Sequence, residues 1–247
     1  TENGQRKLRT DDLKSNVTII ITNPDSLHDN TKVQVRVDFD NWKDGRSPTG
    51  EIIKVFGNKG DNNAEMEAIV AERGFDTTFS DVVLKEAAES AAQLRGENAE
   101  EMAKRKDFRQ TWTCTIDPFD AKDFDDAVYC EPQGKGWRLV VAIADVSFYV
   151  RPGDALDKDA YDRGNSVYFP RRVIPMLPEK LSNNLCSLRP HEDKLTFSAV
   201  FEMTHDGRLI NEWFGRTVIH SDHRFSYEDA QEVLENEEGD VLNPVTE

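Results

Sequence analysis

Five aspartates lie within ten consecutive residues in the middle of the chain, from Asp117 to Asp126. The flanking stretches, 112–116 and 127–130, are rich in aromatic, β-branched and small residues, which is typical of half-buried strands. Carboxylates crowded between two strands repel one another and lose hydration, so a bound cation would stabilise them. Hard oxygen ligands without paired Cys or His favour Mg²⁺ or Mn²⁺ over zinc. The cluster therefore predicts a metal-dependent phosphate chemistry.

The spacing divides the carboxylates between two strand ends. Asp117 ends the first predicted strand. Three more, Asp123, Asp125 and Asp126, lie at the start of the next strand. In an extended backbone Asp123 and Asp125 share one face while Asp126 points away. A bend in the chain is therefore part of the prediction that all four reach one ion.

Other kinds of functional site have weaker support in the sequence than a Mg²⁺ or Mn²⁺ site at the aspartates. An EF-hand calcium loop is excluded because Phe119 and Ala121 occupy positions where that loop needs oxygen ligands. An acidic surface loop is the alternative to a metal site, but it does not explain Phe124 among the carboxylates. His220 and His223 have no Cys partner, which favours surface histidines over metal ligands. Neither a G-x-S-x-G elbow nor a phosphate-binding P-loop is present.

The composition allows one large domain or two ordinary ones. The 247 residues are 37% hydrophobic and 32% charged, which favours a soluble protein with a real core. No apolar run approaches the roughly 20 residues that span a bilayer. Three cysteines without metal-type spacing predict core thiols in a reducing, cytoplasmic setting. The opening without Met or a secretory signal, and the polar end, indicate a piece of a longer protein.

The net charge of −16 is unusual for a nucleic-acid-binding protein, but it is unevenly distributed. Residues 226–247 carry eight acids and no Lys or Arg, and residues 117–132 carry six acids and a single Lys. Residues 133–190, by contrast, hold nine Lys or Arg against six Asp or Glu. A basic surface beside the aspartates is therefore compatible with the sequence.

Short strands precede the aspartates. Each of three segments is either mainly apolar or alternates apolar with polar residues, and turn residues separate them: 17–22, 32–39 and 50–56. This pattern indicates antiparallel strands of a small barrel. Their polar side fits either an oligonucleotide-binding face or a solvated strand face. The basic and aromatic residues concerned are Lys32, Arg36, Trp42, Lys43 and Arg46.

Helices are expected between this barrel and the aspartates. Residues 63–71 predict a short helix, and Ser80 caps a longer one that reaches Leu94 with an apolar stripe that includes Leu84. The charged stretch 97–106 is expected to be mostly exposed.

Four elements are expected after the aspartates. Residues 137–146 predict a buried strand, and Asp145 at its end is interpreted as a hydrogen-bonded structural residue rather than a ligand. The Pro-rich segment 174–188 predicts an ordered, buried loop. Residues 197–220 predict a hairpin, and Ser226 caps a last helix.

Together these segments carry a resemblance. Residues 115–127 resemble the signature of the RNase II/ribonuclease R family of exoribonucleases, which share the RNB domain. Residues 143–147, 166–170 and 174–188 match the same family in the same order. Residues 17–56 are similar, less closely, to the second cold-shock-type RNA-binding module that precedes the catalytic domain in this family.

The resemblance implies Mg²⁺-dependent hydrolysis of single-stranded RNA from its 3′ end, releasing nucleoside 5′-monophosphates. By position, Asp117, Asp123, Asp125 and Asp126 would be the metal ligands and catalytic residues. Asp125 would act most directly in the chemical step. Tyr168 would stack on the terminal base, with a packed aromatic side chain as the alternative.

The resemblance also defines the expected architecture, which is α+β. Residues 1–16 would be a polar tail or linker, 17–75 a partial antiparallel cold-shock (OB-like) barrel, 76–106 a helical connector, and 107–247 the first part of a mixed, β-rich catalytic domain.

A catalytic Arg and Glu of the family fall beyond residue 247, so this piece is expected to be inactive by itself. The alternative is a non-catalytic RNA-binding regulator that keeps the fold. A monomer is expected, without membrane or DNA partners.

Overall fold

The computed structural model describes residues 6–11, 17–23, 27–39, 42, 47–94, 99–170 and 172–235. The chain divides into two compact units, Thr1–Thr78 and Phe79–Glu247. Most of the predicted helical connector therefore belongs to the second unit. Within the described ranges, no helix is both long and apolar enough to cross a membrane.

The first unit contains a four-stranded sheet with the order β1-β2-β4-β3. Its strands are β1 (Lys7–Arg9), β2 (Thr18–Ile21), β3 (Thr31–Asp38) and β4 (Thr49–Asn58). β2 and β4 run parallel, whereas the other neighbours are antiparallel. Strands β2, β3 and β4 confirm the sequence prediction. The expected partial antiparallel barrel is not confirmed in detail, because the described residues form an open sheet in which β2 and β4 are parallel.

Strand β1 corrects the prediction of a polar tail over residues 1–16. Leu8 pairs with Ile19 and Arg9 with Thr18, so the segment extends the sheet at its edge. A strand of three residues is too short to show a periodic pattern, because one apolar position between two basic ones has no repeat.

Helix α1 (Asn62–Glu72) follows β4 in the first unit. The carboxylate of Asp61 caps it by accepting a hydrogen bond of 2.9 Å from the Asn63 amide. Ala64 and Val70 are its buried residues, so one face of the helix packs within this unit.

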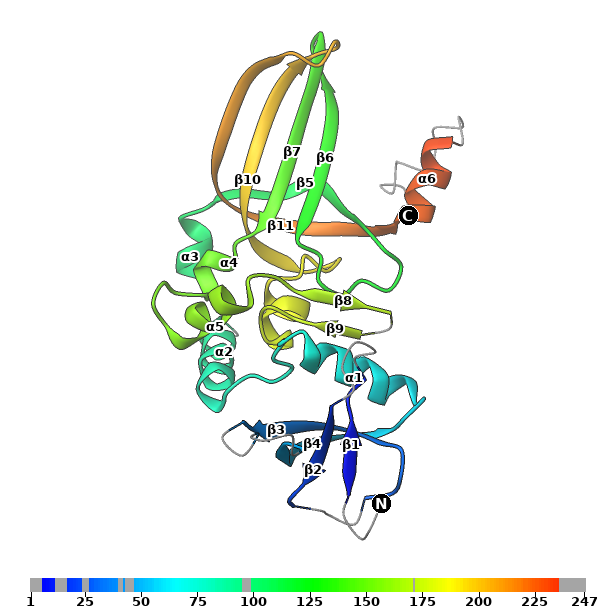
Figure 1. Ribbon diagram of the computed structural model, residues 1–247. Coiled ribbons are helices and arrows are strands. Elements are labelled where there is room, and N and C mark those ends of the chain that lie inside the picture. The colour runs from blue at the N-terminus through cyan, green and yellow to red at the C-terminus, as the bar shows by residue number, and fades with distance from the viewer. Residues whose placement is uncertain are drawn as a thin grey trace. The chain divides into compact units, whose positions relative to one another are not determined.

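The second unit is built on a closed barrel with the order β10-β11-β5-β6-β7 (Figure 1). The strands are β5 (Lys106–Asp117), β6 (Asp126–Gln133), β7 (Gly136–Ala144), β10 (Asp193–Thr204) and β11 (Leu209–Ser226). β5 and β11 are parallel and the remaining neighbours are antiparallel, which confirms the expected mixed, β-rich domain.

Helices border this barrel. They are α2 (Asp81–Leu94), α3 (Ala99–Ala103), α4 (Val146–Tyr149), α5 (Ala155–Arg163) and α6 (Tyr227–Glu235). The predicted caps are confirmed: the hydroxyls of Ser80 and Ser226 accept hydrogen bonds from the amides of Val83 (3.4 Å) and Asp229 (3.0 Å). The predicted apolar stripe of α2 is confirmed at Val83 and Ala87, which are buried, whereas Leu84 of the same stripe is 45% exposed.

A hairpin and a buried loop complete the second unit. The hairpin consists of β8 (Val167–Phe169) and β9 (Arg172–Ile174). The following loop contains one turn of π-helix at Leu181–Leu185. Leu181 and Leu188 are fully buried, which confirms the prediction of an ordered, buried loop. Apolar side chains thus fix this loop to the core.

The stretch 97–106 is mostly exposed where its exposure is described, as predicted, but Arg105 is an exception because it forms a buried ion pair. The guanidinium of Arg105 lies 2.8 Å from the Asp145 carboxylate, and both side chains are at most 2% exposed. Arg105 also donates a hydrogen bond of 3.1 Å to the carbonyl oxygen of Thr196. This buried ion pair confirms the interpretation of Asp145 as a structural residue rather than a metal ligand.

The cysteines are only in part the core thiols predicted. Cys114 and Cys186 are buried, whereas Cys130 on β6 is exposed. All three are free thiols. Burial raises the pKa of the Cys186 thiol to about 12, which makes it a weak nucleophile.

Candidate active site

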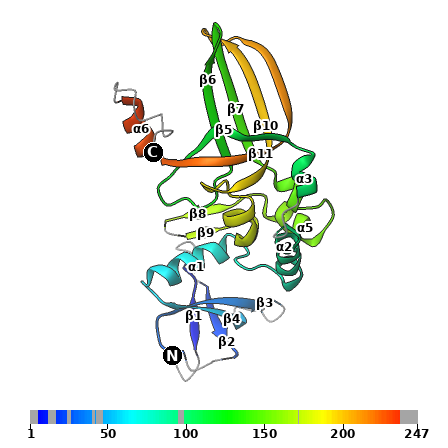
Figure 2. The same cartoon turned by 180° about the vertical axis from the view of Figure 1, so that it is seen from behind.

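The predicted aspartates lie on and beside the connection between β5 and β6. We call residues 118–125 the aspartate loop. Asp117 is the last residue of β5, and Asp126 is the first residue of β6. Since β5 and β6 are neighbours in the barrel, their ends hold the loop at one rim of the barrel (Figures 1 and 2).

The last part of the aspartate loop is fixed by the buried loop that follows β9. The Phe124 side chain is 5% exposed and belongs to the hydrophobic core. Its amide donates a hydrogen bond of 3.1 Å to the Ser187 hydroxyl, and its carbonyl accepts one of 2.8 Å from the Leu188 amide. The Ser187 hydroxyl in turn donates to the carbonyl oxygen of Lys122 at 2.8 Å. Phe124, an unexpected residue among carboxylates, is therefore an apolar anchor.

The first part of the aspartate loop is held by β11. One guanidinium nitrogen of Arg224, Nη2, donates to the carbonyl oxygens of Pro118 (2.9 Å) and Phe119 (2.6 Å). The guanidinium also lies 5.1 Å from the centre of the Phe124 ring. Arg224 can reach the loop because β11 runs parallel to β5, which places it opposite Thr115, two residues before Asp117.

Asp117 is half-buried and carries an unsatisfied oxygen. Its Oδ2 atom is buried and has no hydrogen-bond partner. Burial raises the pKa of the Asp117 carboxyl, and the charges of Asp126 and Asp123 raise it further, while Arg224 opposes them. A buried acceptor without a donor is uncommon, so this atom is suited to a ligand that brings positive charge.

Asp125 is accessible to solvent but electrostatically strained. Loss of hydration is the main cause that raises the pKa of its carboxyl, followed by the charges of Asp123, Asp126 and Asp117. Its backbone is fixed, because its carbonyl oxygen accepts a hydrogen bond of 2.9 Å from the Ala144 amide. The neighbouring carboxylates thus disfavour the ionised forms of Asp117 and Asp125.

Tyr168 contacts this cluster from the β8–β9 hairpin, which both views place beside the aspartate loop (Figure 2). Its hydroxyl donates a hydrogen bond of 2.7 Å to Oδ2 of Asp123, while 63% of the residue stays exposed. This bond is the main cause that raises the pKa of Tyr168 to about 12. The tyrosine is therefore not the packed aromatic residue of the alternative interpretation.

The cluster fits a hard cation by its chemistry, although its side chains are not gathered around one point. Within the described ranges, no three His, Cys, Asp or Glu side chains lie close enough together to hold a metal ion. The donors are carboxylate oxygens only, burial and the neighbouring charges raise the pKa of Asp117 and of Asp125, and one buried oxygen has no partner. Such a set suits Mg²⁺ or Mn²⁺ once the side chains rotate inward. The metal site stays a prediction.

Sequence reasoning missed Ser187 and Arg224. Ser187 lies in the segment 174–188 that was singled out for its Pro and apolar content, but a serine there has no distinguishing pattern. Arg224 follows the two histidines that were set aside, of which His220 contacts Asp193 at 2.7 Å. Neither residue is near the aspartates in the sequence, so only the fold reveals their contacts.

Known proteins resemble both units. Residues 105–244 match the RNB domain family, and residues 8–80 match the Cold shock domain family. The chain is 45% identical to Ribonuclease R of Acidithiobacillus ferrooxidans, over 81% of this chain and 45% of that protein. It is 42% identical to DIS3-like exonuclease 2 of Caenorhabditis elegans, over 77% of this chain and 24% of that protein.

A solved structure has the same fold. Mycoplasma genitalium RNase R in complex with double-stranded RNA superposes with a TM-score of 0.79 and 32% identity, over 89% of this chain and 39% of that one. The chain spans less than half the length of each of these relatives. The expected α+β fold, with a cold-shock-like module before an RNB domain, is thereby confirmed. The chain belongs to the RNB-domain family of RNase II and ribonuclease R.

Proposed function

We propose that the full-length protein is a hydrolytic exoribonuclease that shortens RNA from its 3′ end and releases nucleoside 5′-monophosphates. The observation that carries the proposal is the set of four carboxylates on and beside the aspartate loop, with the unpartnered Oδ2 of Asp117 among them. The family and the relatives named Ribonuclease R support it.

In the proposed site, Asp117, Asp123, Asp125 and Asp126 would hold Mg²⁺ or Mn²⁺. When bound, such a cation would polarise the scissile phosphate and allow hydroxide to form from water near neutral pH. The protein's part is to hold the carboxylates near one another, and the positive charge of the cation would favour their ionised forms. Asp125 is the accessible carboxylate whose pKa is raised by all three neighbours, so it is best placed to act at the reacting phosphate.

Single-stranded RNA is the proposed substrate, because the exposed ring of Tyr168 offers a stacking surface beside the aspartates. An aromatic ring can stack on any base, and one such contact is worth roughly 1–3 kcal/mol. An enzyme that removes successive nucleotides needs this tolerance of sequence.

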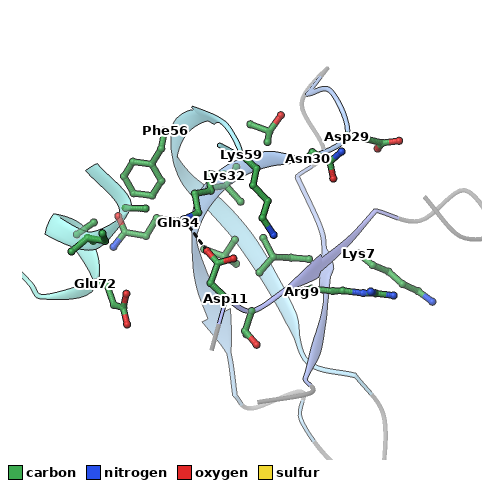
Figure 3. Close-up of a pocket in the computed structure, with 18 of the residues that line it drawn as sticks. Lys7, Arg9, Asp11, Asp29, Asn30, Lys32, Gln34, Phe56, Lys59 and Glu72 are labelled. Carbon is green, nitrogen blue, oxygen red and sulfur yellow. Dashed lines mark ion pairs between the residues drawn. The ribbon is translucent and has the colours of Figure 1, made fainter. Parts of the chain in front are cut away.

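The first unit offers a cavity for the RNA chain, lined by four basic side chains and by Asp11, Asp29 and Glu72. The cavity has a volume of about 1110 Å³ and is lined by Arg9, Lys59 and Phe56 among others (Figure 3). The oligonucleotide face predicted on β3 needs a correction, because Lys32 is only 15% exposed and pairs with Glu65 and with Asp11 at 3.2 Å. Figure 3 shows the pair with Asp11. Of the predicted face, Lys43 and Arg46 lie outside the described residues.

We further propose a monomeric protein in the cytoplasm, supported by free and mostly buried thiols. Because the chain spans less than half of its relatives, catalysis is a property to be measured on the full-length protein. We expect the present chain to be inactive by itself.

The test is degradation of a 5′-labelled single-stranded RNA by the full-length protein, with Mg²⁺ and with EDTA. A ladder that shortens from the 3′ end only with metal is the expected result. Asp125→Asn should abolish the ladder and leave RNA binding within about twofold, as expected for a group that acts in the transition state. Tight binding without any shortening would contradict the proposal and favour a non-catalytic RNA-binding regulator.

A further inference from the structure

We infer that Ser187 and Arg224 are positioning residues that clamp the two ends of the aspartate loop in its reactive conformation. The inference rests on the proposed hydrolytic function of that loop. Neither side chain forms a hydrogen bond with a carboxylate of the cluster. Both act on the backbone that carries the carboxylates, from elements distant in the sequence.

Ser187 fixes the backbone on both sides of Asp123. Its single hydroxyl hydrogen is given to the carbonyl of Lys122 at 2.8 Å, and its oxygen accepts from the amide of Phe124 at 3.1 Å. These partners are the residues directly before and after Asp123. Ser187 is fully buried, so water does not replace the two bonds when the hydroxyl is removed.

The neighbouring amide of Leu188 extends the same clamp. It donates a hydrogen bond of 2.8 Å to the carbonyl of Phe124, so both polar groups of the Phe124 backbone are used. Phe124 lies between Asp123 and Asp125. The direction in which these two carboxylates leave the backbone is therefore set by the buried loop.

Arg224 fixes the beginning of the loop. It donates to two successive carbonyls, those of Pro118 and Phe119, and its guanidinium also lies over the Phe124 ring. One side chain thus joins the first turn of the loop to the apolar anchor near its end. A planar guanidinium can make these contacts together, whereas an ammonium group has no flat face.

The clamp matters for catalysis because the carboxylates come from two places. Asp117 is held by the barrel, whereas Asp123 and Asp125 are held by the loop. Their separation therefore depends on how the loop is fixed against the barrel, and Ser187 and Arg224 supply that fixation. A displacement of about 1 Å in a site of this kind lowers the rate by about 100-fold.

The experiment replaces Ser187 with Ala in the full-length protein. Single-turnover cleavage of a labelled single-stranded RNA should slow by about 10- to 100-fold. The Kd for RNA should stay within about twofold, and the Mg²⁺ concentration for half-maximal rate should rise, since the carboxylates are no longer pre-arranged. A merely structural role would lower the active fraction without changing the Mg²⁺ requirement of the remaining enzyme.

Ser182→Ala is the matched control. Its hydroxyl lies in the same buried loop but contacts Leu177 and Asn183, not the aspartate loop. We expect an unchanged rate and an unchanged Mg²⁺ requirement. If Ser187→Ala does not fold, Ser187→Cys gives the milder test, because a thiol is a weak donor and acceptor of similar size.

Arg224→Lys separates the geometry of this side chain from its charge. The lysine keeps the charge but loses the planar guanidinium, so the rate should fall almost as far as in Arg224→Gln. Arg208→Lys, on the exposed turn before β11, is the control and should match the wild type. A wild-type rate for Arg224→Lys would overturn the positioning role of Arg224.

Failure of this inference can be told from failure of the proposed function. If the wild-type protein degrades no RNA, the proposed function fails. Hydrogen exchange then still tests the clamp, because the Phe124 amide should exchange faster in Ser187→Ala than in Ser182→Ala. If the wild type is active and Ser187→Ala retains its rate, its Mg²⁺ requirement and its slow exchange, the clamp alone is wrong.

Discussion

The hydroxyl of Tyr168 donates a hydrogen bond of 2.7 Å to the carboxylate of Asp123, which ties the β8–β9 hairpin to the aspartate loop. The pKa of Tyr168 is raised to about 12, so the hydroxyl remains a donor at neutral pH. The ring itself is largely exposed. One residue therefore combines the exposed ring that we propose stacks on a base with a polar contact to a proposed metal ligand.

Two substitutions of Tyr168 should separate these roles. Tyr168→Phe keeps the ring, so the Kd for single-stranded RNA should stay within about twofold while the cleavage rate falls several-fold. Tyr168→Ala removes the stacking surface and should weaken binding by roughly 1–3 kcal/mol. Fluorescence anisotropy with a labelled oligonucleotide gives the Kd. Unchanged binding by Tyr168→Ala would exclude stacking on this ring.

Asp125→Asn should raise the stability of the metal-free chain at neutral pH. The folded-state pKa of Asp125 is raised above the ordinary value of 3.8, so ionisation of this group opposes folding above that raised pKa. As the pH falls through the folded pKa, the folded protein takes up the proton first and the penalty is relieved. Below about pH 3.8 the carboxyl is neutral in both states and this contribution disappears.

Thermal unfolding in EDTA from pH 7 to pH 3.5 measures this effect. The midpoint of Asp125→Asn should exceed that of the wild type at pH 7, by an amount that solvent screening of the exposed Asp125 carboxylate keeps small. The gap should close at the acid end, and Mg²⁺ should reduce it at pH 7. A less stable Asp125→Asn at pH 7 without metal would show that other contacts of Asp125 outweigh its lost hydration and the repulsion from its neighbours.

The buried pair of Arg105 and Asp145 should be costly to break. Asp145→Ala removes one of the two carboxylates that pair with the buried Arg105 guanidinium, the other being Glu101 at 2.9 Å. It should therefore lower the free energy of unfolding by more than an exposed pair would, but by less than the about 3–5 kcal/mol lost when a buried charge keeps no partner. Asp206→Ala removes the partner of Arg208 in an ion pair whose side chains are 64% and 78% exposed, and should change stability by less than about 1 kcal/mol. Urea unfolding compares the two variants, and equal losses would contradict the buried role of Asp145.

RNA binding by the first unit should depend on salt through Arg9 and Lys59. If each neutralises one phosphate, replacing either with Ala should reduce the slope of log K against log salt concentration by about 0.7. Lys85→Ala, at a 77% exposed side chain on α2, is the control and should leave the slope unchanged. Titrations of single-stranded RNA at four salt concentrations decide this, and unaltered slopes in both variants would place the RNA elsewhere.

Local sequence patterns were sufficient to predict strands and helix starts where the informative residues lie within a few positions of one another. The alternation of Val33, Val35 and Val37 predicted β3, and the caps at Ser80 and Ser226 predicted two helix starts, because these signals involve residues close in the sequence. The same applies to Asp117 and Asp126, which end β5 and begin β6 as expected, whereas Asp123 and Asp125 lie in the loop before β6 and not in the strand. Local signals therefore located the strand ends that flank the candidate site.

Contacts between distant residues were beyond such reasoning. The burial of Arg105 depends on Asp145 and Thr196, and the fixation of the aspartate loop depends on Ser187 and Arg224. From the sequence alone, a charged or hydroxyl-bearing residue is predicted to be exposed, because the distant partner that allows its burial is not known. The inward approach of Lys32 to Glu65 was missed for the same reason.

The parallel pairing of β5 with β11 has a consequence for how the protein is made. Ser226 lies opposite Asp117, and the Thr113 amide bonds the Asp222 carboxylate over 2.8 Å, although these last two residues are 109 positions apart. β5 pairs with β6 in the barrel at Cys114 and Val128 alone. Chains are synthesised from the N-terminus, and pairings between distant residues form late. The pairing of β5 with β11 therefore forms only after β11 has left the ribosome. A nascent chain that has not yet released β11 would thus lack the pairing that places Asp117.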